Sequence, residues 1–478
     1  MLSMGFARSL RWLAFLVGLV VLPALAIPAQ ASYTAIVGKN LTADGSVLFF
    51  HQEDLSRWAL QHVRVTPRQT HDLTQNPTTR LYWIEIPQVK TTYGYVGVHT
   101  FDPDYVPGGL SFGVNEHGVM IAMNVGYPKE RHPEGKVGLL WSDFMQIVLE
   151  RATTAREAVE FLGWLTETYH NTDDPGQIYG IADPNEGWVF EATVTRWVAK
   201  RVPDDGFHII ANRYTIGSEW DLGSDDVVEF AIANGWYDPE KDGPFHWARH
   251  MTRDAYDGRR EWYPNRPYDY LRELRSVQVL TEAAKKGGIT VQDVMALMRD
   301  HYNDTFLYHD PPHQSPHRTI EVNRTVASLV GQLRSDMPPA IGALAWISLS
   351  PPATTPYLPF HAGITAVPPS VHAGVADNGL ADFDPASAWW SFNIIRTQAE
   401  MDWGRYFPIV RDYWSAFEQR LLLQVPEVEA AALSLWSQGN HAGAQQLLTE
   451  FAASIAEEAR QEAHRLRSWL EAVGANPL

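Results

Sequence analysis

SYTAIVGKNLTADGSVLFFHQED, residues 32–54, has the pattern of two β-strands joined by a turn. Residues 32–37 are short and β-branched, and the Asp44-Gly45 pair is a strong turn signal. The apolar run SVLFF then forms a second strand, so we expect a β-hairpin. The ionisable residues 51–54 lie at the end of this second strand, a position where active-site residues often lie.

The residues before this hairpin have the pattern of a secretory signal peptide. Two arginines precede an apolar run at residues 12–21, and Ala29-Gln30-Ala31 fits the small-residue cleavage motif. The alternative is an uncleaved membrane anchor, which the short apolar run and the two prolines after it disfavour. We therefore expect residues 1–31 to be removed and the mature protein to be exported, periplasmic or extracellular, with no stable membrane anchor.

Cleavage after Ala31 gives Ser32 a free α-amino group beside its own hydroxyl. An α-amine has a pKa of ~7.7–8.0, so it is partly unprotonated at neutral pH and can act as a general base. Activation of a hydroxyl by an N-terminal amine is a recognised arrangement of a nucleophile. A small polar residue is also common after cleavage sites, so this position alone does not establish catalysis.

The composition excludes several classes of function. The 478 residues include 38 Lys and Arg against 56 Asp and Glu, a formal net charge of −18, and 45% are hydrophobic. So acidic a globular protein repels nucleic acid and anionic membranes. The chain has no cysteine, which excludes disulfides, thiolate metal sites and a cysteine nucleophile.

The hairpin sequence resembles the opening of the N-terminal-nucleophile (Ntn) dipeptidases, whose relatives include the secernins. Their motif is Cys-Thr followed by Val-Gly-Lys, Asp-Gly-Ser and an Arg-Asn-x-Asp block. The likeness continues, in family order, through residues 108–124, 154–165, 187–217, 293–305 and 345–364. It implies an α+β fold, the Ntn-hydrolase four-layer αββα sandwich, and hydrolysis of dipeptides. The sequence also resembles, more distantly, the penicillin V acylases and bile salt hydrolases.

The resemblance also implies roles for three residues of the hairpin. The family nucleophile is the first residue of the mature chain, which here is Ser32 in place of Cys. A serine hydroxyl is un-ionised at neutral pH, so it depends more on the neighbouring amine than a thiol does. Asp54 is retained and is implied to orient the α-amine. His51 replaces the family Arg, which exchanges a permanent bidentate donor for a group that titrates near neutrality.

Two asparagines are candidates to stabilise the oxyanion of the reaction. Asn124 ends the apolar run VMIAMN, and Asn212 follows the run FHIIA. A side-chain amide offers hydrogen-bond donors without charge, which suits a developing oxyanion in a dry site. An isolated asparagine at a strand end is more often structural, so both assignments depend on the resemblance.

The remaining pattern predicts one catalytic domain followed by helices. Hydrophobic periodicity predicts one helical stretch over residues 141–170, helices near 268–285 and 290–302, and strands within 320–365. From about residue 386 the chain is helical, with a break at Gly439-Asn440-His441. We therefore divide the chain into a signal peptide (1–31), a catalytic domain (32–385) and a C-terminal helical extension (386–478).

We expect no cofactor and no metal. His309, His313 and His317 recur every four residues, but the prolines between them prevent the helix that would collect them on one face. Arg318 is a candidate to hold a substrate carboxylate, as are Arg259 and Arg260, although surface ion pairing is the commoner role of an arginine.

Three functions remain open at this stage. The first is an exported dipeptidase that takes small peptides as substrates through Ser32. The second is an amidase or acylase of the same fold that acts on non-peptide amides. The third is an inactive binding protein, suggested by the joint loss of the family Cys and Arg. The sequence is also compatible with a homo-oligomer.

Overall fold

The computed structural model describes residues 31–101, 109–132, 137–172, 176–253, 267–374 and 383–476. Residues 1–30, which hold the predicted signal peptide up to its last residue, lie outside the described residues. Ala31–Leu478 forms one compact unit.

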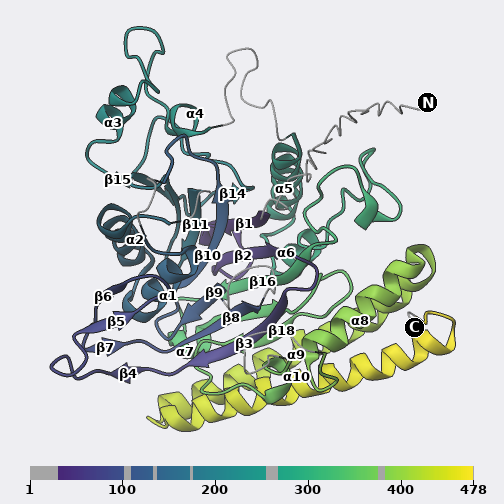
Figure 1. Cartoon of the computed structure of the whole chain (residues 1–478). Helices are drawn as coiled ribbons and strands as arrows, with labels where there is room; N and C mark the ends of the chain where they lie inside the picture. Colours follow the sequence, from purple (N-terminus) through teal and green to yellow (C-terminus); the bar gives the residue numbers. More distant parts are fainter. Residues whose placement is uncertain are drawn as a thin grey trace, which may run out of the picture. The chain divides into compact units, whose positions relative to one another are not determined.

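Two antiparallel sheets form the centre of this unit (Figure 1). The six-stranded sheet has the order β14 (Phe207–Ile210), β1 (Ala31–Val37), β2 (Val47–Asp54), β16 (Thr325–Leu333), β17 (Ala343–Ser348) and β18 (Leu358–His361). The eight-stranded sheet has the order β15 (Leu222–Gly223), β13 (Trp197–Val202), β12 (Gly187–Ala192), β11 (Gly176–Ala182), β10 (Met120–Gly126), β9 (Leu110–Asn115), β8 (Tyr95–Phe101) and β3 (Leu60–Thr66). Two short ribbons pair β4 (Gln69–Thr70) with β7 (Thr91–Thr92) and β5 (Thr78–Arg80) with β6 (Glu85–Pro87).

The predicted hairpin is confirmed as β1 and β2, which lie inside the six-stranded sheet between β14 and β16. The register places Ser32 opposite Glu53 and Thr34 opposite His51. Gly45 makes the turn with a φ of 77°, a conformation that glycine adopts without strain. Because β2 is buried along its whole length, the four polar residues at its end are held by neighbours on both sides.

The two sheets face one another, since β1 lies against β10 and β11. The approach is close at Gly180 of β11, where an added Cβ would lie 2.9 Å from the Thr34 methyl carbon. Successive side chains of β1 point to opposite faces of its sheet, so Ser32 and Thr34 share the face that meets the eight-stranded sheet.

Helices cover the outer faces of both sheets. Helices α1 (Trp141–Arg151) and α2 (Ala155–Tyr169) lie on the eight-stranded sheet, and α5 (Pro267–Lys285) and α6 (Val291–Leu297) lie against β14 and β16. The single helix predicted over 141–170 is wrong in one respect: the chain breaks before α2, where the Thr154 side chain caps the new helix by accepting from the Glu157 N–H. The α+β class is confirmed. The shorter helices are α3 (Val227–Ala233), α4 (Trp247–Met251) and α7 (Pro339–Gly342).

The predicted C-terminal helices are α8 (Ala388–Met401), α9 (Trp403–Ser437) and α10 (His441–Ala472), which lie together in Figure 1. They break at Gly439, whose φ is 78°, and Asn440 then caps α10 through its side-chain oxygen. Helix α10 packs on β18 of the six-stranded sheet and α8 contacts β3 of the eight-stranded sheet, so these helices share one hydrophobic core with both sheets. The division at residue 385 stays a prediction.

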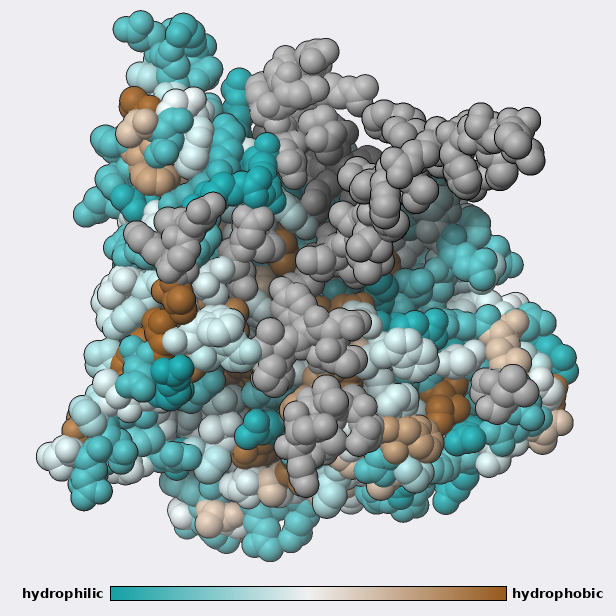
Figure 2. Space-filling view, viewed as in Figure 1, coloured by the Kyte–Doolittle hydropathy of each residue, from teal (hydrophilic) through white to brown (hydrophobic). Residues whose placement is uncertain are grey.

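The described surface is mainly polar on the face that Figure 2 shows, with scattered small hydrophobic patches. No helix among the described residues is both long enough and apolar enough to cross a membrane.

A buried ion pair ties the C-terminal helices to the sheet. Glu429 of α9 accepts from Arg334 at 2.7 Å and from His361 of β18 at 2.9 Å, and its side chain is only 4% exposed. Burial alone would raise the pKa of Glu429, but the hydrogen bonds from Arg334 and His361 outweigh burial and lower it.

We expect Glu429→Gln to lower the free energy of unfolding at pH 7 by about 2–4 kcal/mol, because it leaves the buried guanidinium without its charge partner. Because the pKa of Glu429 is lower in the folded than in the unfolded protein, its ionisation stabilises the fold above the unfolded-state pKa of about 4.3. This contribution to the free energy of unfolding is lost at lower pH. The difference between the two proteins should therefore narrow as the pH falls below about 4.3. Urea unfolding of both proteins at several pH values measures this difference in the free energy of unfolding.

Glu427→Gln, at an exposed position of the same helix, is the matched control and should leave stability unchanged within about 0.5 kcal/mol. Equal unfolding free energies of the Glu429 variant and the wild type at pH 7 would contradict the role of this ion pair.

Candidate active site

Ser32 lies at the start of β1 with only 4% of its surface exposed. Its backbone nitrogen donates to Asn212 Oδ1 at 3.2 Å, and its hydroxyl donates to Glu53 Oε1 at 3.3 Å. In the full-length chain this nitrogen is the amide of the Ala31–Ser32 bond. Both atoms that the predicted mechanism needs are therefore already held by buried side chains.

Glu53 connects Ser32 to His51. The second Glu53 oxygen lies 3.5 Å from His51 Nε2, which is close enough for ion pairing but longer than a normal hydrogen bond. Burial raises the pKa of Glu53, while the neighbouring His51 and the Ser32 hydroxyl partly oppose this effect. A carboxylate with a raised pKa, in contact with a hydroxyl, is a candidate proton acceptor.

Thr34 continues the polar cluster on the same face of β1. Its hydroxyl lies 2.7 Å from His51 Nδ1 and donates to Asn124 Oδ1 at 2.5 Å. Asn124 also donates to the carbonyl of Ile210 at 3.2 Å. Ser32, Glu53, His51, Thr34 and Asn124 thus form one continuous series of polar contacts between the two sheets.

Asn212 lies just beyond β14 with a φ of 63°, in the left-handed region that asparagine tolerates better than most residues. Its side-chain oxygen, rather than its NH₂ group, faces the Ser32 nitrogen, and the NH₂ group donates to the Val125 carbonyl at 3.3 Å. The roles of Asn212 and Asn124 in stabilising an oxyanion stay predictions.

Arg272 of α5 approaches Ser32 from the opposite side of the sheet. It is fully buried and donates to the Ser32 carbonyl at 3.0 Å, to Asn212 Oδ1 at 3.1 Å and to Asp269 at 2.6 Å. Sequence reasoning missed this residue, because an arginine 240 positions from Ser32 gives no local signal.

Asp54 lies at the end of β2, opposite Ala31 in the register. Its carboxylate accepts from Arg318 at 2.7 Å and from the Thr325 hydroxyl at 2.7 Å. Strand alternation turns its side chain away from the face that carries Glu53. The structure therefore brings Asp54 beside the Ala31–Ser32 bond, whereas its predicted role in orienting the amine stays a prediction.

The predicted site residues thus fall into two groups. His51, Asn124 and Asn212 join Ser32 in the cluster between the sheets, and Asp54 lies with Arg318 behind it. Arg318 is engaged in an ion pair with Asp54, with 15% of its side chain exposed, and desolvation lowers its pKa to about 10. Arg259 and Arg260 lie outside the described residues. Glu53, Thr34 and Arg272 are additions that the sequence did not identify as functional.

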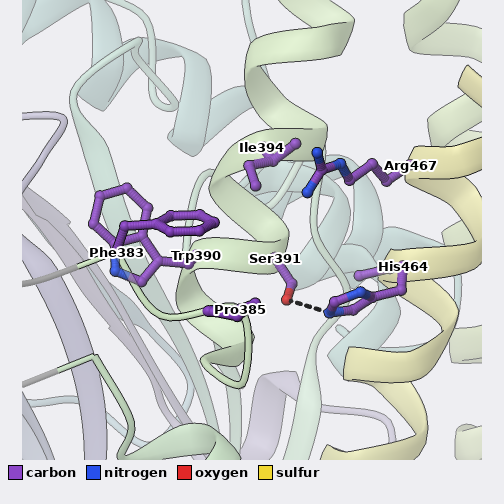
Figure 3. A pocket seen from close by; sticks show the side chains of 8 residues that line it. Phe383, Pro385, Trp390, Ser391, Ile394, His464 and Arg467 are labelled. Atoms are coloured by element: carbon purple, nitrogen blue, oxygen red, sulfur yellow. Dashed lines mark hydrogen bonds between the residues drawn. The ribbon is translucent and has the colours of Figure 1, made fainter. Parts of the chain in front are cut away.

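A surface pocket elsewhere in the chain contains none of these residues. It lies between α8 and α10 and is lined by residues that include Phe383, Trp390 and Arg467, with Ser391 3.2 Å from His464 Nε2 (Figure 3).

The model of peptidase family C69 matches residues 31–416, which begin one residue before Ser32 and include the whole cluster. The chain belongs to peptidase family C69. It is accordingly a hydrolase of peptide bonds, and the binding protein without activity that the sequence left open is not favoured.

Curated relatives carry dipeptidase names. A probable dipeptidase of Latilactobacillus sakei is 27% identical over 371 residues, 70% of this chain and 74% of the relative. A probable dipeptidase of Salmonella dublin is 28% identical over 377 residues, 72% and 84% of the two chains. Among solved structures, penicillin V acylase from Agrobacterium tumefaciens is 13% identical with a TM-score of 0.38, covering 69% of this C69 chain and 86% of its own.

We expect Thr34→Val in this C69 peptidase to reduce kcat for peptide hydrolysis by about 10–100-fold, because it removes the hydroxyl that joins His51 to Asn124. Valine keeps the shape of threonine, so the fold should survive at a cost of about 1–3 kcal/mol for the two polar groups left unpaired. Steady-state kinetics and thermal unfolding measure the two effects.

Thr34→Ser restores the hydroxyl and should recover most of kcat, which a purely structural role of the threonine methyl would not predict. A Val variant with wild-type kcat would show that this contact does not position the site.

Proposed function

We propose that this peptidase is an exported dipeptidase whose nucleophile is Ser32, exposed as the N-terminal residue by cleavage after Ala31. The observation that carries the proposal is that a buried cluster holds both the nitrogen and the hydroxyl of this one residue, at 3.2 Å from Asn212 and 3.3 Å from Glu53. The names of the curated relatives support dipeptides as the substrate class.

The proposed fold is the Ntn-hydrolase four-layer αββα sandwich. Two facing antiparallel sheets, with α1 and α2 on one outer face and α5 and α6 on the other, support it. Ser32 lies at the start of a central strand of this arrangement, where the two neighbouring strands of its own sheet hold it through Glu53 of β2 and Asn212 just beyond β14.

In the proposed reaction the Ser32 oxygen attacks the peptide carbonyl carbon while its proton passes to the free α-amine. The protonated amine then donates this proton to the leaving nitrogen, the C–N bond breaks, and an ester joins the acyl group to Ser32. Water attacks the ester, again giving a proton to the amine, which returns it to the serine oxygen. The carboxylic acid product leaves and the enzyme is regenerated.

Arg272 supports the basicity that this reaction requires. The Arg272 guanidinium, which is paired with Asp269, contacts the Ser32 carbonyl, and the part of its charge that Asp269 does not offset disfavours protonation of a nearby amine. The family Arg is replaced by His51, and Arg272 supplies the positive charge from α5 instead.

Glu53 supplies the additional activation that a serine nucleophile needs in comparison with a cysteine. A thiol has a pKa near about 8.5 and is partly ionised at neutral pH, but a hydroxyl must lose its proton during attack. The Glu53 carboxylate accepts a hydrogen bond from this hydroxyl and increases its nucleophilicity, with His51 on the far side of the carboxylate.

We expect Ser32→Ala to reduce hydrolysis of dipeptides by at least about 10³-fold, because it keeps the α-amine and removes the attacking oxygen. Ser32→Cys should remain active, since the thiol is the better nucleophile and the same amine can activate it. The assay uses exported protein, with a panel of dipeptides and N-acyl amino acids and with the N-terminal residue determined by sequencing.

Wild-type dipeptide hydrolysis by the Ala variant, or a mature chain that begins at another residue, would overturn the terminal nucleophile. Turnover of N-acyl amino acids without turnover of dipeptides would instead assign the amidase function. Substrate binding by the Ala variant, measured by calorimetry, verifies that its site is intact.

We expect Glu53→Gln to lower kcat/KM about 10²-fold in the serine enzyme and less than about 10-fold in the Ser32→Cys enzyme, because an ionisable thiol needs less help. In the serine enzyme activity should fall as the pH drops through the raised pKa of Glu53, and this decline should disappear in the Gln variant. Equal losses in both backgrounds would show that Glu53 acts only through the structure of the site.

A further inference from the structure

Three buried side chains converge in a segment that the proposed reaction does not use. His301 Nε2 lies 3.5 Å from Glu321 Oε1, and His313 Nε2 lies 3.1 Å from the same oxygen. All three atoms lie within 4.8 Å of one another, and the side chains are 4%, 5% and 0% exposed for His301, His313 and Glu321.

One atom of this group lacks a hydrogen bond, although it lies near the Glu321 carboxylate. His301 Nε2 is buried and makes no hydrogen bond to any of the described residues. A buried polar atom without a partner costs free energy, so its retention calls for a ligand. Because the atom points at Glu321, a cation between the two side chains would satisfy it.

The spacing fits zinc. Tetrahedral zinc with bonds of about 2.0–2.1 Å keeps its ligand atoms about 3.3 Å apart, close to the two distances that join Glu321 to the histidines. Two imidazoles and one carboxylate form a zinc ligand set that leaves the fourth position for water.

The groups behind the three side chains also fit a metal site. His313 Nδ1 lies 2.8 Å from Glu400 Oε1, so Glu400 can accept the N–H of a histidine that binds metal through Nε2. The second oxygen of Glu321 accepts from the Ala353 N–H at 2.7 Å. Arg57 and Arg396 hold Glu400 in turn. Such outer contacts orient metal ligands in proteins.

We propose that His301, His313 and Glu321 bind one Zn²⁺ ion, with water as the fourth ligand. The sequence led us to expect no metal, because prolines separate His309, His313 and His317. His309 and His317 are not part of the proposed site. Its other two members, His301 and Glu321, come from positions before and after that loop.

Three protein ligands and one water are typical of catalytic zinc, but the three side chains here are at most 5% exposed, so a substrate cannot reach the ion and its role is structural. Glu321 lies between Arg318 and Thr325, which both bond the Asp54 carboxylate, so zinc at Glu321 would fix the segment that supports the end of β2. His313 also contacts the Trp403 ring at the start of α9, at a centroid distance of 4.8 Å. The ion would therefore connect the sheet to the C-terminal helices, without a part in the proposed reaction.

The test begins with the untagged wild-type chain. After dialysis against Zn²⁺ and then metal-free buffer, elemental analysis should find about one zinc per chain. The Co²⁺-loaded protein should show the visible absorption bands of a tetrahedral site. A zinc content near zero together with no such bands would overturn the proposal.

Variants locate the ion. His301→Gln should abolish stoichiometric zinc binding and the rise in melting temperature that added Zn²⁺ produces in the wild type. His317→Gln, in the same loop but outside the group, is the matched control and should keep both. Zinc retained by the His301 variant, or lost by the control alone, would place the ion elsewhere and overturn the assignment.

The proposed reaction is tested separately. Wild-type protein loaded with Zn²⁺ or with Co²⁺ should have the same kcat for dipeptide hydrolysis within about twofold, because the metal does not touch the substrate. A large change in kcat between the two metals would overturn the structural role of the ion. The loss of zinc binding in the His301 variant does not depend on whether Ser32 is the nucleophile.

Discussion

The antiparallel register of β1 and β2 is the constraint on which the site depends. It places Ser32 opposite Glu53 and Thr34 opposite His51, and these four side chains share one face of the sheet. A shift of one residue would turn every side chain of β1 to the other face and separate Ser32 from its partners. Neighbouring strands on both sides and the close approach at Gly180 prevent such a shift.

The same pair of strands separates charge between its two faces. Behind the sheet, Asp54 pairs with Arg318 and Asp269 with Arg272, so each buried carboxylate has a cation. In front, the partners of Glu53 among the described residues are His51 and the Ser32 hydroxyl, and burial raises its pKa. Buried ion pairs that are complete tend to remain charged, whereas a buried carboxylate without a permanent cation has a raised pKa and accepts a proton more readily. The arrangement favours proton transfer on one face and rigidity on the other.

Much of the fold follows from local sequence, because its signals lie within a few residues. The hairpin, the strands after residue 320 and the C-terminal helices with their break at Gly439 follow from alternation, periodicity and turn residues. The break before α2 was missed because apolar spacing continues across it. Helix α6 ends at Leu297, earlier than the periodicity of residues 290–302 indicated.

The site was predictable only where the family motif or a strand end marked it. Ser32, His51 and Asn212 were identified in this way, and the structure joins them. Glu53 lies in the same block of sequence, but its contact with Ser32 depends on the strand register, which the sequence alone does not specify. Arg272 reaches the site from a helix far along the chain. The contacts of His301 and Glu321 with His313 were not predictable either, because tertiary packing rather than local sequence sets them.

The pairing of Ala31 with Asp54 bears on the order of events during biogenesis. In the uncut chain Ala31 is already part of β1, and the nitrogen of the bond to Ser32 is engaged by Asn212. A processing enzyme that binds its substrate as an extended, accessible strand cannot reach this bond once β1 has entered the sheet. If maturation requires the cut after Ala31, it must therefore outpace folding, and a precursor that folds first becomes a latent form that the same enzyme can no longer convert.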